Sequence, residues 1–332
     1  MKEARLKRTG RKRKILIGIG VFLLVFILLP YLIPVSAADE NQAVQPYADS
    51  QFTVIDSVQL HYRIQVPQGQ EIKGNVLLVH GLGGSTFSFT QNAAALAEAG
   101  YRVVSVDLPG FGYSSRSTRF DHSQVSRAGL LWKLIDQIEG PTEVKWFLAG
   151  HSMGGGTVTA MAYLNPGKTR SVILIDGALI DTNQGAGGIL KIPPLDRYMT
   201  VYLDKFLVTK SNITKFLASA YGRKPSEEEI QEYEEPLLLP GTAACLMGFL
   251  KTSENVPLEK LENLDVAFYG IWGKEDTWVP VDQAVTIKEH IRDFTFVSIE
   301  GAYHCPMETN SEEFNQILIT YLDSITQSTE SS

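Results

Sequence analysis

Short runs of Val, Ile and Leu recur along this chain and constrain its fold more than any other feature. Such runs are typical of strands buried on both faces of a sheet. The segments between them have helical character, and strands that alternate with helices form mostly parallel sheets with helices on both faces. The sequence therefore predicts an α/β fold. The predicted strands are 76–79, 103–106, 144–148, 172–175, 266–271 and 295–299, after a hairpin at 52–66, and the predicted helices are 91–99, 123–138, 153–164, 281–291 and 312–325.

This alternation stops between residues 178 and 258, where no strand is predicted. The stretch contains aromatic-rich amphipathic segments, and Ser226 with Glu229 has the spacing of a capping box at a helix start. We expect a helical cap of residues 178–258, inserted into a core of residues 50–177 and 259–327. The cap would lie over the carboxyl ends of the strands, where α/β sheets bind ligands. A second, independent domain is the alternative.

The first 38 residues have the pattern of a membrane-targeting segment. Residues 1–14 form a basic tail with eight Lys or Arg and one Glu, and residues 15–38 carry no charge. The apolar run is about 20 residues long, enough at ~1.5 Å per residue to cross a ~30 Å hydrocarbon layer. We expect a transmembrane signal anchor, because the apolar core of a cleavable signal peptide has only ~7 to 15 residues. A signal peptide cleaved near Ala37 is the alternative.

Both alternatives place the rest of the chain outside the cytoplasm, because basic flanks stay on the cytoplasmic side. Residues 39–49 are polar and without periodicity, which indicates a linker. Eight of the 30 basic and one of the 37 acidic residues lie in the tail, so the remaining chain has a net charge of −14, which disfavours nucleic acid as a partner. Cys245 and Cys305 match no metal or redox spacing, and the sequence leaves open whether they pair.

Gly150-His151-Ser152-Met153-Gly154 joins the predicted strand at 144–148 to the predicted helix at 153–164. A nucleophilic serine on such a sharp turn exposes its hydroxyl, and glycines two positions to either side remove side chains that would collide. The pattern alone is weak, and its place between a strand and a helix gives it weight. Ser152 is therefore the candidate nucleophile, and an ordinary serine at a helix start is the alternative.

A serine nucleophile needs a histidine as its base and an acid that fixes the tautomer of that histidine. His304 follows the last predicted strand, and Asp276 follows the strand at 266–271. Both therefore come at the carboxyl edge of the sheet and are the candidate base and acid. Glu275, next to Asp276, and Asp176, at the end of the preceding strand, are the alternative acids.

Taken together, these motifs resemble the α/β-hydrolase superfamily over about residues 50–325. Ser152, Asp276 and His304 occur in the order expected of that family. The oxyanion loop of that family is similar in sequence to His80-Gly81-Leu82-Gly83-Gly84-Ser85. The turn after the next strand of that family is similar to Asp107-Leu108-Pro109-Gly110-Phe111-Gly112-Tyr113-Ser114. The resemblance implies that the N–H groups of Leu82 and Met153 bind an oxyanion, and that His80 is structural. We expect His151 to serve packing or gating.

The expected activity is hydrolysis of a carboxylic ester through an acyl-enzyme, as in esterases and lipases, without a metal or organic cofactor. A cap that excludes water and an anchor in a bilayer favour a small-molecule or lipid ester. Amide or peptide cleavage, C–C bond hydrolysis and perhydrolysis are alternatives of the same fold, and a non-catalytic binding module is another. The aromatic residues at 87, 89, 111 and 113 could line an acyl pocket or pack in the core.

Overall fold

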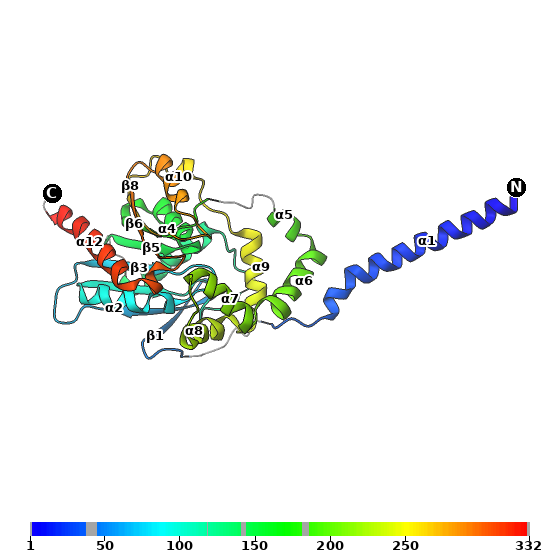
Figure 1. Cartoon of the computed structure of the whole chain (residues 1–332), viewed down its shortest axis with the longest axis horizontal. Helices are drawn as coiled ribbons and strands as arrows, with labels where there is room; N and C mark the ends of the chain where they lie inside the picture. The colour runs from blue at the N-terminus through cyan, green and yellow to red at the C-terminus, as the bar shows by residue number, and fades with distance from the viewer. Residues whose placement is uncertain (1, 38–44, 118, 141–143, 181–185, 331–332) are drawn as a thin grey trace.

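The computed structural model describes residues 2–37, 45–117, 119–140, 144–180 and 186–330 (Figure 1). Residues 39–44 of the expected linker, and Ala38 beside the alternative cleavage site, lie outside the described residues. The described strands form one eight-stranded sheet in the order β1-β2-β4-β3-β5-β6-β7-β8. Its strands are β1 (Ser50–Ile55), β2 (Val58–Gln65), β3 (Gly74–Val79), β4 (Tyr101–Val106), β5 (Trp146–His151), β6 (Thr169–Ile175), β7 (Ala267–Gly273) and β8 (Phe294–Ile299).

The sheet is parallel from β4 through to β8, and only the hairpin strands β1 and β2 run antiparallel to their neighbours. The predicted mostly parallel sheet is thus confirmed. Parallel strands place their carboxyl ends at one edge, so the residues that follow β5, β6, β7 and β8 lie along a single rim. The helices are α1 (Lys2–Leu28), α2 (Thr90–Glu98), α3 (Gln124–Glu139), α4 (Met153–Leu164), α5 (Ala186–Leu190), α6 (Pro193–Tyr202), α7 (Lys210–Tyr221), α8 (Glu227–Leu237), α9 (Thr242–Thr252), α10 (Asp282–His290), α11 (Pro306–Thr309) and α12 (Ser311–Glu330).

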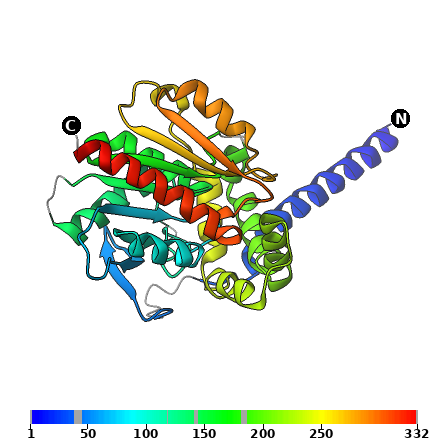
Figure 2. The ribbon, with the colours of Figure 1, turned by 60° about the vertical axis from the view of Figure 1, so that its left-hand side comes forward.

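Both faces of the sheet are buried under helices, as the uninterrupted apolar strands require. In β3, Leu77 and Val79 pack with α3, α4 and α10, whereas Val76 and Leu78 pack with α2 and α12. Figure 2 shows α12 lying across the sheet on the same side as α2. Because side chains alternate along a strand, these four β3 residues contribute in turn to two cores.

The strand predicted at 144–148 is displaced in the structure, where β5 runs from Trp146 to His151. The pairing of His151 with Ile175 of β6 extends the strand through the two residues before Ser152. Val144, at the predicted start, is half exposed. The apolar residues therefore predicted that a strand is present. Its end is set by the hydrogen bonds between β5 and β6.

Helices α5 to α9 lie between β6 and β7 in sequence, and α7 and α8 pack against the core that contains α12. The capping box predicted at Ser226 is confirmed: Ser226 Oγ accepts from the N–H of Glu229, and the Glu229 side chain accepts from the N–H of Ser226. In contrast to these packed helices, α1 extends away from the body as an isolated rod (Figure 1).

Candidate active site

Ser152 occupies a sharp turn between β5 and α4, with a backbone φ of 48° and ψ of −117°. A positive φ is rare for a side chain with a Cβ and costs of order 1–3 kcal/mol, so the surrounding structure must hold it. The Ser152 N–H donates to Ile175 O, and its carbonyl accepts from the N–H groups of Gly155 and Ala178. These bonds hold the serine in the strained conformation.

The two flanking glycines are required by close backbone contacts. A Cβ on Gly150 would lie 2.3 Å from Gly154 O, and a Cβ on Gly154 would lie 2.4 Å from Val79 O. Both distances are far below van der Waals contact, and the opposing atoms are backbone. The glycine spacing predicted around Ser152 thus has a direct steric cause.

His304 and Asp276 come together at the carboxyl edge of the sheet, after β8 and β7. His304 Nδ1 lies 2.7 Å from Asp276 Oδ2, and both side chains are buried. The other oxygen of Asp276 accepts from the N–H groups of Trp278, at 2.7 Å, and Val279. Burial alone would raise the pKa of Asp276, but the hydrogen bond and charge of His304, with the Trp278 N–H, lower it below its usual value. This carboxylate is therefore ionised at neutral pH.

Asp176, an alternative acid, is buried beside this pair. It has a positive φ of 44°, and one of its oxygens accepts from the N–H of Gly273 at 2.9 Å. Burial, the charge of Asp276 and a hydrogen bond to Asp276 raise the pKa of Asp176 well above its usual value. Burial and the neighbouring Asp276 therefore disfavour the charged form of Asp176. Glu275, the other alternative, is exposed.

Oxygens of these two aspartates and a nitrogen of His304 lie within 4.8 Å of one another, a spacing that could surround a cation. The 2.7 Å contact between His304 Nδ1 and Asp276 Oδ2 is, however, a direct hydrogen bond, which a metal at this point would have to displace. The arrangement fits a carboxylate that orients an imidazole.

A cavity of about 100 Å³ contains both Ser152 and His304 in its wall. Leu82, in the loop after β3, lines this cavity on the side of the sheet. Side chains of α7, α8 and the loop after β7 line the other side, and these are Phe216, Leu217, Ala220, Tyr233 and Trp278. The Trp278 ring lies 5.0 Å from the His304 ring and 4.5 Å from that of Phe216, which links the inserted helices to the histidine.

Of the two residues expected as oxyanion donors, only Leu82 is among the described residues that line this cavity. Leu82 lines the cavity, and Met153 directly follows Ser152 as the first residue of α4. The first N–H groups of a helix have no acceptor within that helix, which leaves the Met153 N–H available. A turn bond from Gly84 N–H to Gly81 O shapes the loop around Leu82.

The other two histidines near Ser152 have structural partners. His80 Nδ1 contacts Gly81 O at 2.7 Å, and its Nε2 accepts from the N–H of Leu108 at 2.9 Å, so both nitrogens hold loops together. His151 Nε2 donates to the carbonyl of His304 at 2.7 Å. Burial and the nearby His304 lower the pKa of His151 to about 3, which keeps its ring neutral.

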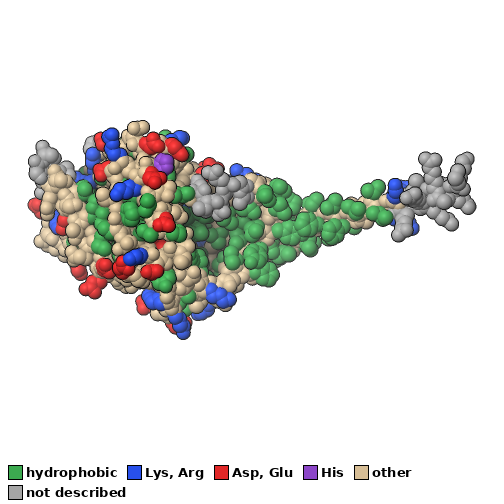
Figure 3. Space-filling model, turned by 45° about the horizontal axis from the view of Figure 1, so that its top comes forward, with side chains coloured by type: hydrophobic (Ala, Val, Ile, Leu, Met, Phe, Trp, Pro, Cys, Tyr) green, Lys and Arg blue, Asp and Glu red, His purple; other side chains and the backbone are tan. Residues whose placement is uncertain are grey.

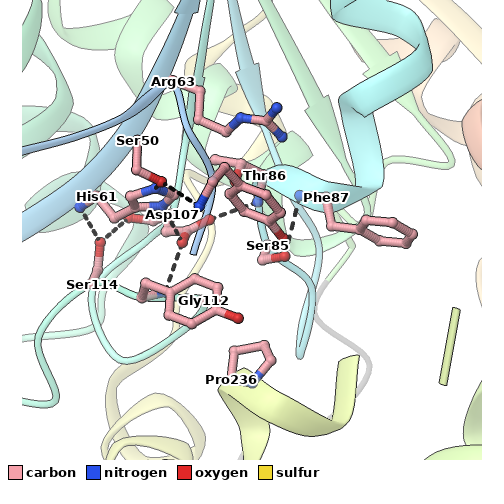
Figure 4. Close-up of polar contacts among 12 residues, drawn as sticks. Ser50, His61, Arg63, Ser85, Thr86, Phe87, Asp107, Gly112, Ser114 and Pro236 are labelled. Atoms are coloured by element: carbon pink, nitrogen blue, oxygen red, sulfur yellow. Dashed lines mark hydrogen bonds and ion pairs between the residues drawn. The ribbon is translucent and has the colours of Figure 1, made fainter. Parts of the chain in front are cut away.

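A second array of serine, histidine and aspartate, not anticipated from the sequence, is formed by residues of β1, β2 and the loop after β4 (Figure 4). His61 Nε2 lies 2.8 Å from Ser50 Oγ, and His61 Nδ1 lies 2.7 Å from Asp107 Oδ2. Asp107 also accepts from the N–H groups of Thr86 and Tyr113. All three members are buried, and none lines the cavity. This array ties the loop after β3 to the loop after β4.

A buried carboxylate next to the cavity also escaped the sequence interpretation. Glu308, in α11, accepts from Tyr221 Oη at 2.5 Å and from Tyr233 Oη at 2.6 Å. Tyr233 Oη also contacts Ser88 Oγ at 3.0 Å. Burial raises the pKa of Glu308 to about 7, although these hydrogen bonds act to lower it. Both tyrosines come from the inserted helices, and no local pattern marked Glu308.

Other candidates behave as packing residues. Phe89 and Phe111 are almost fully buried in the two cores, and neither lines the cavity. Cys245 and Cys305 are both free and buried. Burial raises the pKa of the Cys305 thiol well above its usual value, which makes it a poor nucleophile.

A larger open cavity of about 1110 Å³ lies beside the β1–β2 hairpin, bordered by Asp56, Arg119 and Asp121. Ser152 and His304 do not line it. Volume alone therefore does not select the candidate site, which we choose for the strained serine and the histidine that share one cavity wall.

Comparison with known proteins agrees with the fold that positions these residues. A family model described as alpha/beta hydrolase fold matches residues 74–311. A pimeloyl-[acyl-carrier protein] methyl ester esterase of Shewanella woodyi is 29% identical over 265 residues, 78% of this chain and 96% of its own length. A 2-hydroxy-6-oxononadienedioate/2-hydroxy-6-oxononatrienedioate hydrolase of Escherichia coli is 26% identical over 273 residues, 77% and 88% of the two chains. A solved structure of a membrane phospholipase A superposes with a TM-score of 0.68 at 21% identity, over 98% of this chain and 99% of that one.

Proposed function

Because the chain belongs to the α/β hydrolase family, we propose that it is a serine hydrolase that cleaves carboxylic esters. The observation that carries the proposal is the strained Ser152, which shares one cavity with a His304 that is hydrogen-bonded to an ionised Asp276. Backbone strain of this kind is found mainly at functional sites, where the strained conformation has a role in the mechanism.

In the proposed mechanism, Ser152 Oγ attacks the ester carbonyl while Nε2 of His304 takes its proton. The contact of Nδ1 with Asp276 holds the proton on Nδ1 and leaves Nε2 as the base, and the carboxylate stabilises the imidazolium that forms. His304 then protonates the leaving alcohol, and water attacks the acyl-enzyme with the same base. The N–H groups of Leu82 and Met153 would bind the oxyanion, and losing one such donor typically costs ~2.7 to 4 kcal/mol.

Asp276 is the proposed acid, and Asp176 is its neutral neighbour. An ionised carboxylate is needed to stabilise an imidazolium, and the raised pKa of Asp176 favours its protonated form, whereas the lowered pKa of Asp276 favours its carboxylate. A protonated Asp176 would donate a hydrogen bond to Asp276 and help to hold it in place.

The cavity lining favours an apolar ester over a dicarboxylate. The name of the Escherichia coli relative describes a dioate, which a protein recognises with cationic side chains. Among the described residues that line the Ser152 cavity there is neither Lys nor Arg. Two of the proteins compared above are an esterase and a phospholipase by name, which supports ester chemistry, with C–C hydrolysis as the second candidate.

We further propose that α1 anchors the body in a membrane, with the body on its outer side. The segment Lys12–Leu32 has 21 residues, and only 6% of its apolar window is buried by the rest of the protein. At ~1.5 Å per residue it is about 32 Å long, close to the ~30 Å hydrocarbon layer. An exposed apolar rod of this length is unfavourable in water, which distinguishes it from a core helix. Membrane fractionation with sequencing of the mature N-terminus tests this, since a soluble protein that starts near Ala38 would exclude the anchor.

A fluorophosphonate probe tests the catalytic proposal, because it modifies only an activated serine. The full chain and the Ser50→Ala variant should be labelled, whereas Ser152→Ala should not. Ser50 provides a matched control, since it also contacts a histidine that contacts an aspartate. Failure of the folded full chain to react would favour a non-catalytic binding module.

Substrate class is tested with nitrophenyl esters of increasing chain length and with aminoacyl anilides. Esters should be hydrolysed faster than anilides, because nitrophenolate is a better leaving group than an aniline and depends less on protonation by His304. Faster anilide turnover would indicate a peptidase. Turnover of a vinylogous diketone without ester turnover would indicate a C–C hydrolase.

A further inference from the structure

Part of the inserted helical segment exposes large apolar side chains to its surroundings. Ile189 and Ile192 lie in and after α5, and Tyr202, Phe206 and Leu207 lie at the end of α6 and in η4 (Leu203–Leu207), a π-helical turn. We call these five residues the apolar patch. Their exposed fractions run from 43% to 64%. The rings of Tyr202 and Phe206 stack with centroids 6.1 Å apart, so they face the same side.

The apolar patch is continuous with the apolar surface of α1. Arg197 of α6 donates to the carbonyls of Pro30 and Ile33, and Tyr198 Oη donates to Phe26 O at 2.8 Å. The rings of Phe26 and Tyr198 lie 5.0 Å apart. Figure 3 shows hydrophobic side chains running from α1 onto the adjoining part of the body without interruption. The helix that holds the end of α1 therefore also leads into the patch.

The sequence segment that carries the apolar patch has a net charge opposite to that of the rest of the body, although Lys205 and Lys210 pair with Asp204 and Glu234. Residues 186–216 contain five basic residues (Lys191, Arg197, Lys205, Lys210 and Lys215) and two acidic ones (Asp196 and Asp204), a local charge of +3 in a chain of net charge −7. The four lysines are exposed. An apolar face with basic residues around it is the composition of segments that lie in the interface of an anionic membrane.

We propose that the apolar patch lies in the interfacial layer of the bilayer that α1 enters, with the surrounding lysines on anionic lipid headgroups. This contact goes beyond anchoring, because it fixes the orientation of the body on the membrane. Helix α7 begins three residues after Leu207, and Phe216, Leu217 and Ala220 of α7 line the Ser152 cavity. One helix therefore runs from the membrane contact to the cavity.

The test measures the depth of Phe206 in the full chain, reconstituted into vesicles of phosphatidylcholine and phosphatidylglycerol. The Phe206→Cys variant carries an environment-sensitive fluorophore. The matched control is Val285→Cys in α10, which is 50% exposed and lies away from α1 in Figure 1. The unmodified chain gives the background, which should be low because Cys245 and Cys305 are buried.

At position 206 we expect a blue-shifted emission, loss of quenching by aqueous iodide, and strong quenching by lipids spin-labelled near the headgroup. At position 285 we expect iodide quenching only. Iodide quenching that is equal at the two positions would overturn the proposal. Shielding from iodide without quenching by lipid would also overturn it and would indicate a second copy of the chain on the patch. Equal lipid quenching in phosphatidylcholine alone would remove the role given to the lysines. None of these readouts requires activity, so they stand apart from the proposed ester chemistry.

Discussion

Replacement of Asp276 by Asn is the sharpest perturbation of the proposed site, because it changes the charge and hydrogen-bonding role of one atom at nearly constant shape. Asp276 Oδ1 accepts from the N–H groups of Trp278 and Val279, and the amide oxygen of Asn can keep both bonds. The amide NH₂ must then face His304 Nδ1, where Asp276 Oδ2 now lies at 2.7 Å. Because NH₂ only donates, Nδ1 becomes the acceptor and the proton moves to Nε2, where His304 can no longer act as base.

A wrong histidine tautomer with intact geometry lowers kcat about 10⁴-fold in serine hydrolases, which corresponds to about 5.4 kcal/mol of transition-state stabilisation. Fold stability should change far less, since the two backbone hydrogen bonds remain. We therefore expect an Asp276→Asn protein that unfolds cooperatively near the wild-type temperature but hydrolyses a nitrophenyl ester at about 10⁻⁴ of the wild-type rate.

Asp176→Asn is the matched control. The raised pKa of Asp176 disfavours its charged form, and its backbone has the positive φ that Asn tolerates, so a neutral amide should replace it with only a severalfold change in rate. The assay is the initial rate of ester hydrolysis together with the rate of fluorophosphonate labelling, both normalised to folded protein. A loss of activity in Asp176→Asn with activity retained in Asp276→Asn would refute the reasoning and make Asp176 the operative acid.

Two further predictions concern stability, both measured by urea unfolding in detergent. Gly154→Ala should lower the free energy of unfolding by about 1–3 kcal/mol and reduce labelling of Ser152, because its Cβ meets Val79 O at 2.4 Å. Gly129→Ala, whose Cβ meets nothing within 4 Å, should instead stabilise by about 0.5–1 kcal/mol, and equal effects would contradict the steric argument. For Glu308, the raised pKa means that folding favours the protonated form. Its favourable contribution is full below its usual pKa of 4.5 and is lost as the pH rises through about 7. The wild-type free energy of unfolding should therefore fall by about 3 kcal/mol more than that of Glu308→Gln between these pH values, and parallel curves would show that Glu308 ionises normally.

Several features of the protein could be predicted from short stretches of sequence. Buried parallel strands require apolar side chains on both faces, so the runs of Val, Ile and Leu predicted the sheet and its helices. The turn at Ser152 requires glycines at 150 and 154 for steric reasons, and this requirement can be read within five residues. His304 was identified because it follows the last strand, and parallel strands end at a common edge.

Other features depend on residues that are distant in sequence, and only the tertiary structure decided them. The contact of His304 with Asp276, and the raised pKa of Asp176, follow from how the loops after β6, β7 and β8 meet. The buried array of Ser50, His61 and Asp107 has the residue types of a triad, and only its absence from the cavity wall distinguishes it from the candidate site.

The apolar patch and the Glu308 cluster have the same origin. A leucine or phenylalanine in an amphipathic helix can face a core or a membrane, and a glutamate in a short helix can face water or two tyrosines. Periodicity in the sequence determines which residues share a face of an element. What that face packs against can depend on segments more than 160 residues away, as in the contact of Arg197 with Pro30 and Ile33, because burial and hydrogen bonding act through space.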